Sequence, residues 1–266
     1  VNSKTGRAKL ADYENNPEFC EALRTIFMTA MGGNIEVFVT GGAAIPDYIE
    51  QLLAVKLKTP FVTGYGMTEC APTISLGHIG AYKLKSVGEY VSEHIDVNID
   101  SVSPARIAGE VLVKGDCVFS GYYKNQEATD SVFTEDGWFR TGDIGIVDKD
   151  GYVYLKGRSK CMILGANGQN IYPEELEAVI NNVTYVIESL VVEEGGGLTA
   201  LIYPDYHQAE LDGLDKEALE KRISDGLPEI NRLLPAYASI RKIEFMPEDF
   251  ERTPKRNIKR YLYQRN

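Results

Sequence analysis

The segment Thr63-Gly64-Tyr65-Gly66-Met67-Thr68-Glu69 constrains what this chain can fold into more than any other part of its sequence. It follows the short apolar run Phe61-Val62, which predicts a turn at the C-terminal end of a buried strand, where open α/β sheets bind ligands. The two glycines let the backbone approach a ligand closely. Tyr65 offers a flat face to a base, Thr68 a hydroxyl to a phosphate oxygen, and Glu69 a carboxylate to Mg²⁺. Taken alone, the segment also suits an ordinary glycine-rich turn that exposes a tyrosine.

The pattern of apolar residues along the chain changes twice, near residue 85 and near Gly157. Before residue 85, a helical pattern, a strand at 35–39, a helix after Pro46 and the strand at 61–62 predict half of a doubly wound sheet. Short apolar runs at 110–113, 144–147 and 152–155, with Asp150-Gly151 as a hairpin signal, predict a small antiparallel barrel or sheet. After Gly157 the pattern predicts a helix from Pro173, a hairpin around 195–197, a long amphipathic helix at 219–234 and a strand at 240–245. Gly226 and Pro228 are candidate positions for a kink in the long helix.

These patterns predict an α/β plus α+β fold with three parts. Residues 1–85 would form part of a doubly wound α/β subdomain, and residues 86–158 a small β-barrel-like or antiparallel subdomain. Residues 159–266 would form a compact C-terminal α+β domain.

Composition limits the classes of partner. The 266 residues carry a net charge of −11, which argues against nucleic acid and against a polybasic membrane surface. No apolar run is long enough to cross a bilayer and no signal peptide opens the chain, which begins with Val rather than Met. The scattered cysteines Cys20, Cys70, Cys117 and Cys161 suit a reducing cytosol. We therefore expect a cytoplasmic location, with peripheral membrane contact left open.

Further motifs occur in a fixed order around the first segment: Gly41-Gly42-Ala43-Ala44, Phe139-Arg140-Thr141-Gly142-Asp143, Gly157-Arg158-Ser159-Lys160 and the basic run 252–260. From about residue 36 to the C-terminus, this set resembles the adenylate-forming superfamily of acyl-CoA synthetases, adenylation domains and luciferases. The segments 167–173 and 258–263 most resemble the corresponding segments of long-chain fatty acyl-CoA synthetases. The resemblance implies an ATP-dependent, AMP-forming acid–thiol ligase with fatty acid, ATP and CoA as substrates and Mg²⁺ as its metal.

The resemblance also implies a role for each matching residue. Glu69 would hold Mg²⁺, Thr68 would contact the α-phosphate, Asp143 the ribose hydroxyls, and Arg158 the sugar or phosphate. Residues 1–85 would bind the nucleotide and the acyl chain, and Lys160 would be the hinge before a mobile C-terminal domain, residues 159–266. The implied nucleotide-binding residues are Gly42, Ala43, Ala44, Gly64, Tyr65, Gly66, Thr68, Asp143 and Arg158, and the implied CoA-binding residues are Gly165, Ala166, Asn167 and Gly168. As single residues, Asp143 also suits a turn cap and Arg158 a surface ion pair.

Two departures from the family pattern remain. Its phosphate-binding loop, which precedes Gly41, has no counterpart between Val1 and Thr40, so we expect a C-terminal half whose N-terminal half is missing and which alone is inactive. The catalytic lysine expected before Ile258 is replaced by Asn257. Lys255 or Lys259 would substitute for it, or adenylation uses another donor. An acyl-AMP ligase, a ligase for another acid, and a non-catalytic nucleotide- or partner-binding module stay as alternatives.

Overall fold

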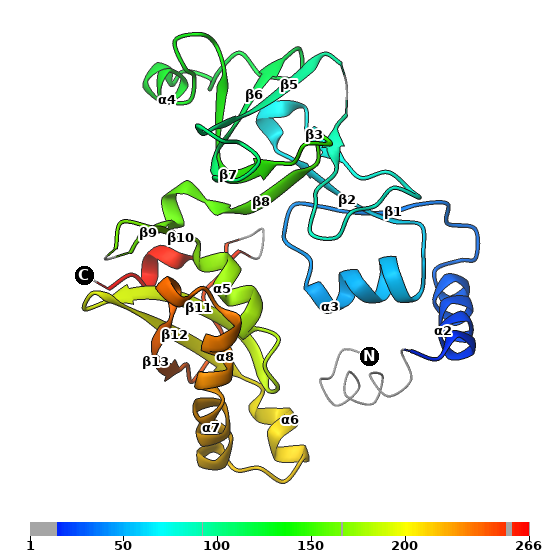
Figure 1. The fold of residues 1–266 in the computed structure, drawn as a ribbon, viewed down its shortest axis with the longest axis vertical. Helices are drawn as coiled ribbons and strands as arrows, with labels where there is room; N and C mark the ends of the chain where they lie inside the picture. The colour runs from blue at the N-terminus through cyan, green and yellow to red at the C-terminus, as the bar shows by residue number, and fades with distance from the viewer. Residues whose placement is uncertain (1–14, 92, 166, 254–256, 266) are drawn as a thin grey trace. The chain divides into compact units, whose positions relative to one another are not determined.

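The computed structural model describes residues 15–91, 93–165, 167–253 and 257–265 of the chain. The chain divides into two compact units, and the boundary lies between Lys160 and Cys161 (Figure 1). Each unit has its own hydrophobic core. Among the described residues, no helix has both the length and the apolar character needed to cross a membrane.

The first unit begins with helix α2, Pro17–Ala30, which the side chain of Asn16 caps by accepting hydrogen bonds from the backbone of Glu18 and Phe19. Strands β1 (Phe38–Thr40) and β2 (Phe61–Gly66) then pair in parallel. Helix α3 (Asp47–Glu50) and a π-helical segment (Gln51–Lys56) connect them (Figure 1). The predicted strand–helix–strand unit is therefore present, and it continues into the antiparallel strands β3 (Thr73–Leu76) and β4 (Glu89–Tyr90).

Strand β2 is longer than the sequence predicted. We expected it to end at Val62, but the glycine-rich segment Thr63–Gly66 continues the strand. Gly64 pairs with Leu76 and Tyr65 with Ser75 on β3, and this non-local pairing keeps two glycines in extended backbone. The turn follows later, as a 3-10 turn at Thr68–Cys70.

The second sheet of this unit is antiparallel and has the order β5-β6-β7-β8. Its strands are Ile95–Asp100, Gly109–Gly115, Phe139–Val147 and Val153–Arg158. The described residues form an open sheet here, not a closed barrel, because no ladder joins β5 to β8. Helix α4, Gln126–Ser131, lies in the connection between β6 and β7. One buried cluster joins Tyr65, Cys70 and Ile74 to Val111 and Phe139, so the two sheets share a core.

The second unit is built on a three-stranded sheet. Strands β11 (Val186–Glu194) and β12 (Gly197–Pro204) form the predicted hairpin, and β13 (Ile240–Phe245) pairs in parallel with β12. A small antiparallel pair, β9 (Ile163–Leu164) and β10 (Asn170–Ile171), precedes helix α5 (Pro173–Ile180). Figure 1 shows α5 beside β11, and Leu176 and Ile180 of this helix are buried in the core of the unit.

The long helix predicted at 219–234 is two helices, and the break lies at the candidate kink, Gly226. Helix α7 spans Lys216–Asp225 and α8 spans Leu227–Leu233, and Gly226 is both the C-cap of the first and the N-cap of the second. Pro228 lies in the first turn of α8, where backbone N–H groups have no partner within the helix, so the missing N–H of proline costs no hydrogen bond. The apolar face nevertheless continues across the break, since Leu219, Ile223 and Ile230 all reach the same core. Helix α6, Tyr206–Leu211, completes this layer.

Candidate functional site

Three residues named from the sequence meet in the first unit. The hydroxyl of Tyr65 on β2 donates a 2.7 Å hydrogen bond to Oδ2 of Asp143 on β7. Nη1 of Arg158, at the end of β8, lies 2.9 Å from Oδ1 of the same carboxylate. The Asp143 side chain is 16% exposed and that of Arg158 is 54% exposed, so a largely buried carboxylate lies beside a solvent-exposed guanidinium.

A bulge in β7 explains why Asp143 points toward β2. Strand β6 pairs regularly with Phe139 and Arg140 and again with Ile144, but the three residues between them are displaced from the ladder. Gly142 lies there with φ +72°, a left-handed conformation that favours glycine. Glu110 accepts a 3.0 Å hydrogen bond from the Gly142 amide and a 2.8 Å bond from Arg140, which holds the bulge in place.

The electrostatics of this contact keep Tyr65 protonated. Burial raises the pKa of Tyr65 well above its ordinary value, and the negative charge of Asp143 raises it further. The tyrosine therefore acts as a fixed hydrogen-bond donor at neutral pH, and Asp143 is the acceptor. The sequence suggested only that Tyr65 offers a flat face, and nothing in the sequence marked it as the residue that orients Asp143.

The 3-10 turn after β2 carries Thr68 and Glu69. Thr68 is exposed and Glu69 is partly buried. The hydroxyl of Tyr122 donates a 3.1 Å hydrogen bond to Oε1 of Glu69, and the Phe119 amide donates a 2.8 Å bond to the backbone carbonyl of Glu69. Sequence reasoning did not anticipate Tyr122, because it lies 53 residues from its partner without a distinctive motif.

Glu69 is a single carboxylate, and the described residues contain no group of three or more His, Cys, Asp or Glu side chains that could hold a metal ion. One carboxylate nevertheless suits Mg²⁺, which typically takes one or two protein carboxylates and completes its shell with phosphate oxygens and water.

The segment Gly42, Ala43 and Ala44 follows β1 and is exposed. It begins beside β2, because a Cβ atom on the neighbouring Gly41 would lie only 2.8 Å from the carbonyl oxygen of Gly64. The structure thus places the two glycine motifs, far apart in sequence, next to each other. Lys160 is exposed and closes the first unit within a 3-10 turn, Ser159–Cys161.

The remaining candidates belong to the second unit. Gly165, Asn167 and Gly168 connect β9 to β10, where the Gly165 amide donates to the Gln169 carbonyl at 2.8 Å and the Gly168 amide to the Gly165 carbonyl at 2.8 Å. Asn167 and Gly168 are exposed. Ala166 lies outside the described residues, as does Lys255.

Lys259 is engaged by an acid of its own unit. Its Nζ lies 3.1 Å from Oε2 of Glu251, and hydrogen bonding to this carboxylate raises the pKa of Lys259. The Lys259 amide also donates to the Glu251 carbonyl at 2.8 Å, and the Thr253 amide to the Asn257 carbonyl at 2.8 Å. These backbone pairs fix Asn257 and Lys259 on one antiparallel arrangement with residues 251–253.

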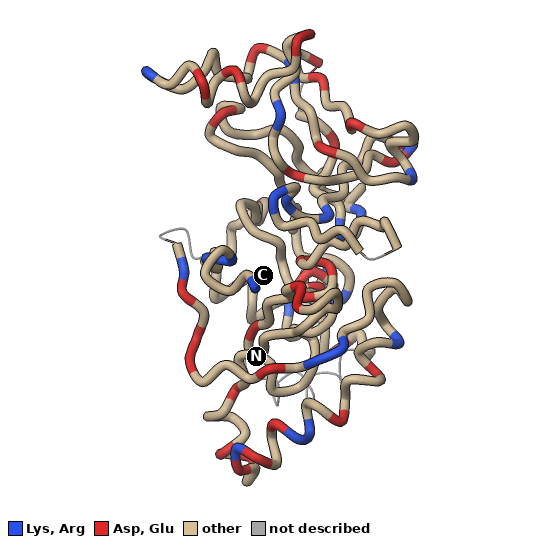
Figure 2. Tube along the Cα trace, turned by 90° about the vertical axis from the view of Figure 1, so that its left-hand side faces the viewer, with Lys and Arg blue, Asp and Glu red and all other residues tan. Residues whose placement is uncertain are grey.

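Most of the basic C-terminal segment pairs with acids of the same unit. Arg252 pairs with Glu188, Arg265 with Glu244 and Glu194, and Arg260 with the buried Glu177. Burial alone would lower the pKa of Arg260, but its hydrogen bonds to Glu177 and the charge of that carboxylate raise it. The described part of the basic C-terminal segment therefore docks on acidic residues of its own unit. Figure 2 shows the acidic residues spread over both units.

Comparison with known proteins gives matches over most of the chain. Residues 7–123 match the family described as AMP-binding enzyme, and residues 161–266 match the AMP-binding enzyme C-terminal domain. The long-chain-fatty-acid–CoA ligase FadD15 of Mycobacterium bovis is 31% identical over 253 residues, which is 87% of this chain and 40% of that protein. The long-chain-fatty-acid–CoA ligase FadD13 of Mycobacterium tuberculosis is 38% identical over 174 residues, 62% of this chain and 34% of that protein.

Solved structures show the same fold. ATP-bound MatB from Rhodopseudomonas palustris superposes with a TM-score of 0.72 at 25% identity, covering 96% of this chain and 52% of that one. The adenylation domain of a carboxylate reductase from Mycobacterium chelonae reaches a TM-score of 0.76 at 22% identity, over 94% of this chain and 40% of that one.

The chain thus spans about two fifths of the length of the ligases that it matches. Both family matches and the relatives support the resemblance drawn from the ordered motifs. The chain belongs to the adenylate-forming superfamily of AMP-binding enzymes, close to the long-chain acyl-CoA synthetases.

Proposed function

We propose that this chain is the C-terminal portion of an ATP-dependent long-chain fatty acid–CoA ligase. The observation that carries the proposal is the meeting of Tyr65, Asp143 and Arg158, residues from three strands and two sheets, at one sheltered carboxylate. Relatives also support the proposal, because several proteins that match most of this chain are named long-chain-fatty-acid–CoA ligases.

The proposed reaction has two steps. A fatty acid carboxylate attacks the α-phosphorus of ATP, forming acyl-AMP and releasing pyrophosphate. The thiol of CoA then attacks the acyl carbon, which breaks the bond to AMP and releases AMP and a proton. In the first step the protein mainly holds the reactants in line and offsets negative charge.

The proposed nucleotide contacts lie in the first unit. Asp143, oriented by Tyr65 and Arg158, would accept the ribose hydroxyls, and the exposed Thr68 hydroxyl would donate to the α-phosphate. Gly42, Ala43, Ala44 and the backbone of Gly64 and Gly66 would lie against the nucleotide. Glu69 would hold Mg²⁺, which neutralises phosphate charge when bound.

The second unit would supply the remaining groups. Lys259, or Lys255, would approach the phosphate during adenylation in place of the lysine that Asn257 replaces. For Lys259 this requires release from Glu251, its partner at 3.1 Å. The loop formed by Gly165, Ala166, Asn167 and Gly168 would contact the thiol-bearing arm of CoA. Lys160, at the end of the first unit, would be the hinge about which the second unit moves between the two reaction steps.

The test is pyrophosphate exchange into ATP by the intact protein, with palmitate as the acid. We expect exchange that depends on the acid and is lost in Asp143→Ala, and palmitoyl-CoA as the product when CoA is added. The 266-residue chain alone should show no exchange. Exchange without transfer to CoA would support an acyl-AMP ligase instead, and a lack of exchange with any carboxylic acid would refute the ligase proposal.

A further inference from the structure

The two sheets of the first unit are joined by the segment that follows β3. The Thr63 hydroxyl on β2 donates to the Ser86 carbonyl at 2.6 Å, and the Ser75 hydroxyl on β3 donates to the Val87 carbonyl at 2.8 Å. On the other side, Val87 donates its amide to the Val153 carbonyl at 2.9 Å, and the Val153 amide donates to Gly88 at 2.9 Å. Residues 86–88 therefore connect the sheet that carries Tyr65 with the sheet that carries Asp143 and Arg158.

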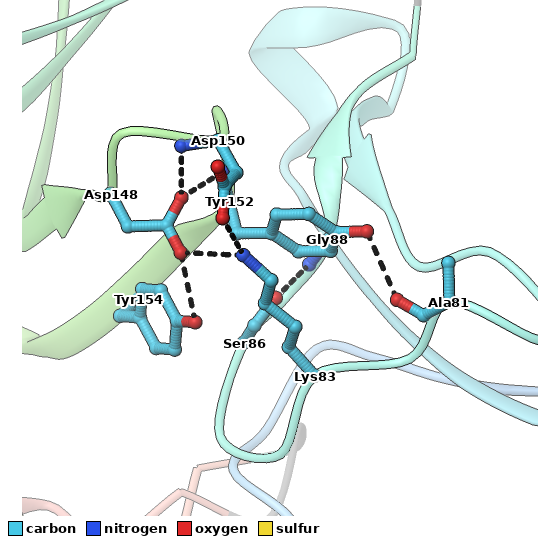
Figure 3. Close-up of polar contacts among 8 residues, drawn as sticks. All are labelled: Ala81, Lys83, Ser86, Gly88, Asp148, Asp150, Tyr152 and Tyr154. Atoms are coloured by element: carbon cyan, nitrogen blue, oxygen red, sulfur yellow. Dashed lines mark hydrogen bonds and ion pairs between the residues drawn. The ribbon is translucent and has the colours of Figure 1, made fainter.

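Lys83 reinforces this connection at the turn between β7 and β8. Its Nζ lies 2.9 Å from Oδ2 of Asp148 and 2.7 Å from Oδ2 of Asp150. The same ammonium lies 4.0 Å from the ring centroid of Tyr152, at cation–π distance. Figure 3 shows the lysine side chain reaching from its own loop into this group of two carboxylates and an aromatic ring.

The partners of Lys83 are themselves fixed. Asp148 accepts a 3.2 Å hydrogen bond from the Tyr154 hydroxyl, and the Tyr152 hydroxyl donates a 3.0 Å bond back to the Ala81 carbonyl (Figure 3). The Lys83 side chain is 33% exposed and that of Asp148 is 26% exposed, so the pair is sheltered. An isolated surface pair of this kind contributes little, but several charges in one network contribute more.

These contacts act on the two strands that form the candidate nucleotide site. Asp148 directly follows β7, which carries Asp143, and Tyr152 directly precedes β8, which ends at Arg158. The Tyr65 hydroxyl reaches Asp143 across the gap between the sheets at 2.7 Å, so a small shift between the sheets breaks that bond.

We propose that Lys83 is a positioning residue for the nucleotide site: it fixes the β7–β8 hairpin against the β2 sheet and so keeps Asp143 within reach of Tyr65. Lys83 does not contact the nucleotide. The inference rests on the proposed function, because it takes Asp143 to be the ribose-binding carboxylate.

The experiment uses the whole chain and AMP as the probe. Lys83→Met keeps an unbranched side chain and removes the charge. We expect AMP affinity to fall about tenfold, because the misplaced Asp143 would lose the binding free energy of about one hydrogen bond. Amide exchange across residues 139–147 should become several-fold faster. Lys83→Arg keeps the cation and its aromatic contact, and should restore both quantities to near the parent values.

The matched control is Lys85→Met in the same loop. Lys85 pairs with Asp47 at 2.8 Å, outside the Lys83 group, and its side chain is 65% exposed. This variant should leave AMP affinity and exchange at 139–147 unchanged. Parent-like affinity and exchange in Lys83→Met, or failure of Lys83→Arg to rescue, would overturn the inference. If the parent chain does not bind AMP, the nucleotide assignment of Asp143 fails. The exchange data still decide whether Lys83 fixes the β7 strand.

Discussion

At the scale of single residues, the orientation of Asp143 depends on neighbours that no sequence motif identifies. The motif 139–143 marked Asp143 itself, because its residue types match a family pattern. Tyr65 as its donor, Glu110 as the partner that holds the bulge, and Tyr122 on Glu69 all depend on contacts between distant segments. The sequence therefore named Asp143 as a candidate site residue, whereas the hydrogen bonds that orient its side chain were not predictable from sequence.

We predict that Asp143→Ala removes AMP binding by this chain. The substitution deletes the acceptor proposed for the ribose and leaves Tyr65 and Arg158 without their shared partner. Tyr65→Phe, which removes only the donor, should weaken AMP binding by roughly tenfold, within the range for a hydrogen bond to a charged group. Calorimetric titration with AMP measures both effects. Asp130→Ala, an exposed aspartate on α4, is the control, and equal losses in all three variants would contradict the prediction.

A second residue-scale prediction concerns Glu177 in the other unit. Its buried carboxylate accepts a 2.7 Å hydrogen bond from the Val191 amide and a 2.8 Å bond from Nη1 of Arg260. Glu177→Ala leaves the guanidinium and the amide without this partner, and we expect the free energy of unfolding of the C-terminal unit to fall by about 3 kcal/mol. Urea unfolding measures this. Glu175→Ala, an exposed position on the same helix, should cost less than about 0.5 kcal/mol.

At the scale of elements, sequence periodicity located the helices and strands better than their ends. The β11–β12 hairpin and strand β13 lie where the apolar patterns predicted them, whereas the first strand, predicted at 35–39, spans Phe38–Thr40. The extension of β2 through Gly66 and the displaced residues of β7 depend on pairing with strands elsewhere in the chain. Whether the strands β5 to β8 form an open sheet or a closed barrel depends on which strands pair, and local sequence does not determine that pairing.

The end of β2 gives an element-scale prediction. A Cβ atom on Gly66 would lie 1.9 Å from the carbonyl oxygen of Pro72, a backbone atom that has no free rotation to move aside. Gly66→Ala should therefore displace the turn that holds Thr68 and Glu69 and destabilise the first unit by more than about 2 kcal/mol. Gly64→Ala meets the flexible end of Leu76 at 3.1 Å and should cost clearly less. Thermal unfolding of both variants would contradict this reasoning if their losses were equal.

Strands β11, which ends at Glu194, and β13, which carries Glu244, give a prediction about pH. Arg265 binds Glu244 at 2.7 Å and 2.8 Å and Glu194 at 3.0 Å, and these hydrogen bonds lower the pKa of both carboxyls below their ordinary value of 4.5. A lowered pKa in the folded state stabilises the fold above pH 4.5, and this contribution is lost as pH falls through the folded-state pKa. Arg265→Gln should lower the urea midpoint at pH 7 and flatten its decline below pH 4.5. If the urea midpoint of the variant declines below pH 4.5 as steeply as that of the parent, other carboxylates cause the decline.

At the scale of the whole molecule, the core residues that the structure describes in each unit come from that unit alone. The larger core of the second unit runs from Ile171 to Ile240, and a smaller one places Leu190, Val192 and Leu201 around Phe250. The core of the first unit lies between Tyr65 and Phe139. Two separate cores joined at Lys160 are what independent folding of each unit requires.

We therefore predict that limited proteolysis cuts this chain first between residues 157 and 168. Lys160 is exposed and offers a trypsin site at the boundary, whereas the helices and strands from 173 to 245 bury their apolar faces in the two cores of the second unit. The fragment from 161 onward should survive digestion and keep a cooperative unfolding transition. Lys160→Gln should slow the trypsin cut without moving the preferred region for a protease of broad specificity. Cuts spread evenly from 173 to 245 would show that the second unit depends on the first for its stability, which would also remove the basis for a hinge at Lys160.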